Sequence, residues 1–168
     1  MNSPETPSCA SSNIASAVVC RPASPEEIPL LIEFVLQMAA DSEGRLLDPL
    51  IAGEGVQAIF NEPALGTYWV IFHREIHQPV GCCLVTTEWS DWHNAPYWWI
   101  QSAYIRPDYR GQGLFHQLMQ ALESAAKAQD VCSLRLYVHK DNASAIAVYQ
   151  RQGFSADRYC CMEKPLNR

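Results

Sequence analysis

The pattern of apolar and polar positions becomes regular only after residue 17. Residues 1–17 are rich in Ser and Pro and show no periodicity, so we expect a disordered lead-in followed by one domain over residues 18–168. The run Ser24-Pro25-Glu26-Glu27 is typical of a helix start, with Ser24 as the cap and Glu27 closing a capping box. Helical spacing of apolar residues follows from Ile28, and a second short helix is expected over residues 55–61.

The middle and the end of the chain alternate between strand and helix patterns. Residues 67–73, 80–88 and 97–105 read as three strands. After Pro107 the apolar residues from Leu114 to Ala126 form one face of a helix. Strands are expected over 131–138 and 154–162, on either side of a helix that Asn142 caps and Gly153 ends. The order β-α-α-β-β-β-α-β-α-β predicts an α/β domain.

Composition narrows the class of protein. The chain has 168 residues, of which 48% are hydrophobic and 18% charged, enough for one domain with a substantial core. The net charge of -6 and the pI of about 5.3 argue against a nucleic-acid partner, which needs clustered Lys and Arg. No apolar run approaches the roughly 18 residues of a membrane helix, so no membrane partner is expected.

The cysteines suggest a reducing environment. There are seven, with no Cys-x-x-Cys pair, which fits neither a disulfide framework nor a zinc site. Residues 1–17 also lack the features of a signal peptide. We therefore expect a cytoplasmic protein that needs no metal, with Cys82, Cys83 and Cys132 as small buried hydrophobes.

A glycine-containing loop, Arg110-Gly111-Gln112-Gly113-Leu114, joins a strong strand to a strong helix. Its glycines uncover backbone N–H groups at the positive end of the helix dipole, where a pyrophosphate can bind. An ordinary turn is the alternative. A dinucleotide site would need a third glycine where His116 stands, and no Gly-Lys-Ser/Thr follows for a kinase-type loop.

Two segments resemble known motifs. Residues 105–113, with the pattern Ile-x-Pro-x-Tyr-Arg-Gly-x-Gly, resemble motif A of the GCN5-related N-acetyltransferases (GNAT family). The spacing Asn142-x-x-Ala145-x-x-x-Tyr149-x-x-x-Gly153-Phe154 resembles their motif B. The resemblance implies a single GNAT-like domain, with a mixed, mostly antiparallel sheet of about six or seven strands flanked by helices. Its central strands, here 97–105 and 131–138, would splay apart.

The resemblance also implies a site for acetyl-CoA, with the pantetheine arm between the splayed strands. The backbone of Ala103, Tyr104 and Ile105 would pair with the pantetheine amides, and Asn142 and Tyr149 would touch the cofactor. The pyrophosphate would bind the N–H groups of Arg110, Gly111, Gln112, Gly113, Leu114 and Phe115. Phe115 departs from the family pattern, which has Gly or Ala there; its side chain could point into the core.

Acetyl transfer needs a proton donor for the leaving thiolate and a route for the amine proton. Tyr149 matches the family's general acid, since a tyrosine is protonated at neutral pH; its alternative role is a core aromatic. The base is less defined. Many relatives carry a carboxylate where Gln101 and Ser102 stand, so Glu88 and Asp91 are the nearest candidates, with His93 a third. An exposed hairpin loop is the simpler explanation for each of these residues, and deprotonation by water stays open.

The acceptor region is expected at the same hairpin, where tryptophans are dense. Trp89, Trp92, His93 and Gln101 are the candidate substrate-binding residues, because aromatic rings can form a wall or a cation–π cage for an amine. The expected function is acetyl-CoA-dependent transfer to a primary amine of a small molecule or peptide. A non-catalytic acyl-CoA sensor of the same fold is the alternative, and a nucleotide-dependent oxidoreductase is weakened by His116. Many relatives dimerise, so a homodimer is among the expected assemblies.

Overall fold

The computed structural model describes residues 17–156 and 161–166, and its centre is a five-stranded sheet in the order β1-β2-β3-β4-β5. Neighbouring strands from β1 to β4 pair antiparallel, while β5 runs parallel to β4. The predicted α/β fold with a mixed, mostly antiparallel sheet is confirmed. The strands are β1 (Val18–Pro22), β2 (Thr67–His73), β3 (Gln78–Ser90), β4 (Ala95–Ile105) and β5 (Ser133–Leu136).

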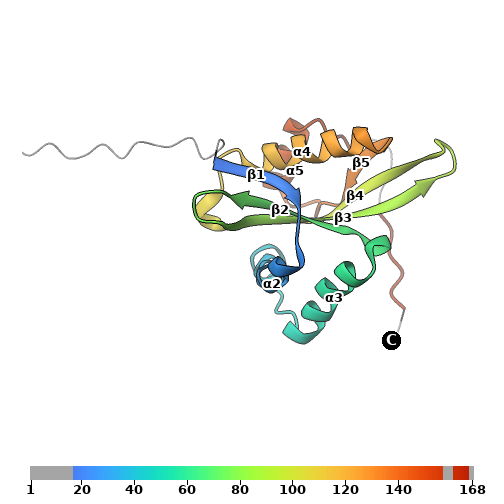
Figure 1. Ribbon diagram of the computed structural model, residues 1–168. Helices are drawn as coiled ribbons and strands as arrows, with labels where there is room; N and C mark the ends of the chain where they lie inside the picture. The colour runs from blue at the N-terminus through green and yellow to red at the C-terminus, as the bar shows by residue number, and fades with distance from the viewer. Residues whose placement is uncertain (1–16, 157–160, 167–168) are drawn as a thin grey trace, which may run out of the picture.

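Helices cover both faces of the sheet (Figure 1). Helices α2 (Ile28–Glu43) and α3 (Pro49–Asn61) lie on one face, and α4 (Leu114–Ala128) and α5 (Ala143–Arg151) lie on the other. Three short 3-10 turns precede longer elements: η1 (Pro25–Glu27), η2 (Pro63–Leu65) and η3 (Pro107–Tyr109). The β3–β4 hairpin extends beyond the rest of the sheet. None of the helices in the described residues is long and apolar enough to span a bilayer.

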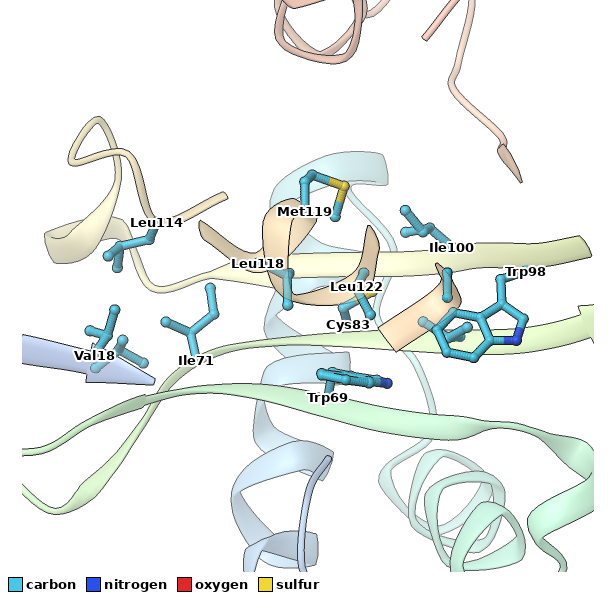
Figure 2. Close-up of a cluster of buried hydrophobic side chains, with 13 residues drawn as sticks. Val18, Trp69, Ile71, Cys83, Trp98, Ile100, Leu114, Leu118, Met119 and Leu122 are labelled. Atoms are coloured by element: carbon cyan, nitrogen blue, oxygen red, sulfur yellow. The ribbon is translucent and has the colours of Figure 1, made fainter. Parts of the chain in front are cut away.

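Two apolar cores follow from this layering. Between the sheet and α4, Leu118 and Leu122 are fully buried against Ile71 and Cys83 (Figure 2). On the other face, Leu31 and Phe34 of α2 pack with buried side chains of β2, β3 and β4. Alternating side chains of the central strands supply both cores, because successive residues of a strand point to opposite faces.

Two expected strands differ from the structure. Within the described residues the sheet has five strands rather than the six or seven expected, and β5 is shorter than residues 131–138 because its pairing with β4 ends at Ile100 and Leu136. Residues 154–156 and 161–162 of the expected last strand lie outside any strand, and 157–160 fall outside the described residues, as does the lead-in apart from Ala17. Strand-like composition is not enough for a strand at residues 154–156 and 161–162, because ladder hydrogen bonds also require the chain to run alongside a sheet edge.

The second helix starts six residues earlier than the sequence suggested. Asp48 is its N-cap and accepts a hydrogen bond of 2.8 Å from the Leu50 N–H, while Pro49 occupies the first turn. Asp48 and Pro49 are ordinary signals for the start of a helix. The apolar pattern after them is interrupted by Gly53 and Gly55, which is why the sequence indicated a later start. The first helix behaves as predicted, since the Glu27 carboxylate accepts from the Ser24 N–H at 2.8 Å.

The cap at Asp48 yields a stability prediction. Asp48→Ala should lower the free energy of unfolding by about 1 kcal/mol, because the Leu50 N–H loses its acceptor. Asp48→Asn keeps an acceptor oxygen and should leave stability nearly unchanged. Denaturant midpoints of the three proteins measure the difference, and equal midpoints for Ala and wild type would show that the cap contributes nothing.

Cysteine burial yields a second prediction. Burial raises the pKa of Cys82 to about 12 and raises that of Cys83 further, whereas Cys132 and Cys161 are exposed. Cys132 was expected to be buried, but it follows the last turn of α4 at the protein surface. Because the thiolate is the reactive form, iodoacetamide should modify Cys132 and Cys161 in the native protein and spare Cys82 and Cys83. Peptide mass spectrometry reads the pattern; native labelling of Cys83 would contradict the packing.

Candidate active site

The loop before α4 presents a row of free backbone donors. Gly111 and Gly113 have φ of 75° and 77°, and a Cβ added at either would meet nothing within 4 Å. The first helical bond of α4 runs from the Gln117 N–H to the Gly113 carbonyl at 3.2 Å. Within the described residues, no group accepts a hydrogen bond from the N–H groups of residues 111–116. Six free donors at the positive end of a helix are suited to an anion.

The side chain of Arg110 is held away from that row. Its Nε donates to the Ile105 carbonyl at 2.8 Å, and its Nη2 pairs with the Asp41 carboxylate at 2.8 Å. Its backbone N–H donates to the Pro107 carbonyl at 3.2 Å. The Arg110 side chain therefore connects the loop to the end of β4 and to α2. The hydrogen bonds of this side chain do not involve the free N–H groups of residues 111–116.

Strands β4 and β5 separate beside this loop. Their parallel pairing runs from Tyr97 with Ser133 to Ile100 with Leu136 and then ends, while β4 continues to Ile105. At the same place β4 carries a bulge, because Ser102 pairs with Leu84, Ile100 pairs with Val85, and Gln101 is the extra residue. A bulge leaves backbone groups unpaired. On its other side, the edge of β4 from 101 to 105 pairs with no strand among the described residues.

Tyr149 lies on α5 beside this opening. Its ring contacts Phe115 of α4, with ring centres 5.6 Å apart, and Phe154, at 6.0 Å. Burial raises the pKa of Tyr149, with a smaller contribution from Cys83 of β3. The hydroxyl makes no hydrogen bond with the described residues, so this protonated oxygen is available as a donor. Asn142 begins the same helix by accepting from the Ala145 N–H at 3.0 Å.

A cluster of aromatic and charged side chains covers the opposite face of the sheet where β4 and β5 part. Trp99 stacks on Tyr137 with ring centres 4.5 Å apart. The Arg135 guanidinium lies 3.4 Å above the centre of the Tyr97 ring and pairs with Glu88 at 3.4 Å. The Trp99 indole N–H also donates to Glu88. We call Glu88, Tyr97, Trp99, Arg135 and Tyr137 the aromatic face.

A pocket of about 360 Å³ adjoins the aromatic face at the hairpin. His93 is held there, with its Nδ1 2.8 Å from the Tyr97 hydroxyl and 3.0 Å from the Ser90 hydroxyl. The pocket is lined by Glu88, Trp89, Ser90, Asp91, Trp92, His93, Tyr97 and Arg135. This wall combines aromatic rings with both signs of charge, which suits a small polar organic ligand.

The model of the acetyltransferase (GNAT) family matches residues 34–154, most of the chain. The chain belongs to the GNAT family. GNAT acetyltransferases use acetyl-CoA as the acyl donor.

Comparisons with individual GNAT proteins agree at the level of the fold. A structure described as a possible acetyltransferase from Clostridium difficile 630 superposes with a TM-score of 0.84 at 28% identity, covering 90% of this chain and 99% of that one. An aminoglycoside acetyltransferase from a soil metagenome, in complex with sisomicin, superposes with a TM-score of 0.74 at 13% identity, covering 92% and 99%. At that identity the second structure supports the fold alone.

Two curated relatives match a shorter segment. They are L-methionine sulfoximine/L-methionine sulfone acetyltransferases of Pseudomonas aeruginosa and Pseudomonas paraeruginosa, 42% identical over 53 residues. The match spans about a third of this chain and of each relative, 32% and 31%.

The residues predicted to hold the cofactor lie on β4, on the loop and first turn of α4, and at the start and middle of α5. Ala103, Tyr104 and Ile105 form the end of the open β4 edge, although the Ile105 carbonyl already accepts from Arg110. Of the predicted phosphate donors, only Arg110 has its N–H engaged within the described residues. Phe115 points into the core beside α5, so its bulk leaves the donor row open. Within the described residues, no three His, Cys, Asp or Glu side chains group as metal ligands.

The residues predicted to serve the acceptor divide into two groups. Glu88 belongs to the aromatic face, and Gln101 lies at the bulge, where its side chain donates to Thr86 at 2.7 Å. Asp91, Trp89 and Trp92 lie at the hairpin end, with Trp92 85% exposed. The first group adjoins the strand opening, whereas the second lies a few residues farther along the hairpin. Their catalytic and binding roles stay predictions.

Sequence reasoning missed Trp99, Arg135 and Tyr137 as site residues. The sequence requires Trp98 or Trp99 to pack in the core without saying which, and it places Arg135 and Tyr137 only on the second face of the strand expected over residues 131–138. A signal was present, since Arg135 and Tyr137 share one face of the predicted strand 131–138. Arg135 and Tyr137 can be identified as site residues only once that strand is known to lie beside β4, which the sequence pattern does not specify.

Proposed function

We propose that this protein is an acetyl-CoA-dependent N-acetyltransferase that transfers the acetyl group directly to a primary amine of a small molecule or peptide. The observation that carries the proposal is the row of six free N–H donors at residues 111–116, set beside the open edge of β4. Such a row fits a pyrophosphate, and the edge fits an extended chain with amide groups. Family membership supports the donor.

Acetyl-CoA, when bound, supplies a thioester whose carbonyl carbon forms the new C–N bond while its C–S bond breaks. Residues 111–116 bind and orient the phosphates, and the β4 edge aligns the arm that follows them. Tyr149 holds a proton at its hydroxyl and gives it to the departing sulfur. Glu88, or a water beside the aromatic face, takes the proton that the amine nitrogen loses.

The same geometry would serve a sensor that binds acyl-CoA without turnover, so the test must separate binding from transfer. CoA thiol release should be measured with acetyl-CoA over a panel of primary amines that includes L-methionine sulfone, the substrate in the relatives' name. If the protein transfers the acetyl group, thiol release should require an amine and should be matched by an equal amount of acetamide product. A sensor predicts that acetyl-CoA raises the melting temperature while every amine leaves the thiol unreleased, which would overturn the proposal.

A further inference from the structure

Arg135 is anchored but largely unused as a donor. The Cζ atom of its guanidinium lies 3.4 Å from the centre of the Tyr97 ring and 5.5 Å from the centre of the Trp99 ring, so two aromatic side chains hold it by cation–π contacts. Its contact with Glu88 comes from one nitrogen, Nη1, at 3.4 and 3.5 Å. Within the described residues, Nε and Nη2 make no hydrogen bond. A stacked guanidinium with free edge donors is suited to bidentate binding of an anion.

The ion pair with Glu88 is weak enough to rearrange. It is long, and the side chains of Arg135 and Glu88 are 32% and 47% exposed, so water competes with it. Glu88 keeps a second partner in the Trp99 indole N–H. An incoming carboxylate could therefore bind the free edge of Arg135 while Glu88 stays in place.

The position of Arg135 limits the shape of the ligand. Arg135 precedes Leu136, whose pairing with Ile100 is the last before β4 and β5 separate. Trp99 and Tyr137 stack beside the same point. If the reacting amine enters at the strand opening, its neighbouring substituents meet Arg135 and Glu88 first. A cation and an anion side by side match a molecule that carries its ammonium and carboxylate groups on the same carbon atom.

We propose that the acceptor is a free α-amino acid, and that Arg135 selects it by binding its carboxylate. This inference rests on the proposed acetyltransferase function and adds the acceptor class and its specificity residue. The amino group lies toward Glu88 and the strand opening, and the side chain of the amino acid lies toward the pocket at residues 88–93. A simple amine would leave Arg135 without its anion and is the poorer acceptor.

The test compares each amino acid with its decarboxylated amine. The pairs are L-phenylalanine with 2-phenylethylamine and L-methionine with 3-(methylthio)propylamine, assayed by CoA thiol release. The wild type should prefer the amino acid in at least one pair. Arg135→Gln should lower the ratio of kcat/KM values, amino acid over amine, by about 10- to 100-fold, as expected for loss of a charge-assisted hydrogen bond. Arg135→Lys, which keeps the charge, should recover part of the ratio.

The ratio separates recognition from damage to the fold, because misfolding lowers both rates together. Arg74→Gln, which removes an exposed arginine at the β2–β3 turn, should leave the ratio unchanged. A wild type that acetylates amines but neither amino acid, or an unchanged ratio in Arg135→Gln, overturns this inference and leaves the acetyltransferase function standing. Absence of thiol release with every amine and amino acid overturns both.

Discussion

Tyr149→Phe is expected to lower kcat for acetyl transfer by about 10²- to 10⁴-fold, the usual cost of losing a general acid. The phenylalanine ring keeps the contacts with Phe115 and Phe154, so α5 should stay in place. Only the proton donor at the strand opening is removed, and acetyl-CoA affinity should barely change. The loss should be smaller with acyl donors whose thiol leaves easily, because they need less protonation.

The pH dependence of the wild type follows from the pKa of Tyr149. Burial disfavours the phenolate and raises this pKa above its ordinary value of about 10. The neutral, proton-donating form therefore persists through neutral and mildly alkaline pH. On the alkaline side kcat should hold to about pH 10, and the fall beyond it should be missing in Tyr149→Phe.

Tyr68→Phe is the matched control. Tyr68 is also a buried tyrosine, with its pKa raised to about 12 by burial, but it packs against α3 on the other face of the sheet. Its substitution should leave kcat unchanged. If Tyr149→Phe turns over acetyl-CoA at the wild-type rate, with chemistry shown to be rate-limiting, Tyr149 is a packing residue and the proton comes from elsewhere.

Gly113→Val should abolish the stabilisation that acetyl-CoA gives the wild type. Acetyl-CoA at 100 times its Kd should add about 2.7 kcal/mol to the free energy of unfolding, which raises Tm by about 5–10 °C for a chain of this size. Gly113 has a φ of 77°, where a β-branched residue is strained, and its missing Cβ faces open space beside the donor row. A valine there both shifts the loop and fills the space that a phosphate needs.

Gly44→Val separates the effect of backbone strain from the loss of space for a phosphate. Gly44 ends α2 with a φ of 63° and also has nothing within 4 Å of an added Cβ. It carries similar backbone strain outside residues 111–116, so its own Tm should fall while the shift with acetyl-CoA stays. Each shift is measured against the same variant without ligand. A full shift in Gly113→Val would mean that the phosphates bind elsewhere.

The sequence by itself determined most of the local structure and the chemistry of the cofactor loop. Residues 67–73 alternate between two apolar faces and form β2 within the predicted bounds. Gly113 and the apolar stripe from Leu114 place a free helix end after a strand, because glycine permits the positive φ and the stripe requires a buried face. These features depend on neighbouring residues, which is why a linear pattern shows them.

Only the tertiary structure decided the acceptor side. Glu88, Trp99 and Arg135 come from three strands and meet because β5 lies parallel to β4 for four residue pairs and then separates. The separation depends on where pairing stops, and the bulge at Gln101 depends on the register between β3 and β4. Neither is encoded in the alternation of one strand, because each is a property of how two strands are aligned. The same reason explains why residues 154–156 and 161–162 lie outside any strand although their composition predicts one.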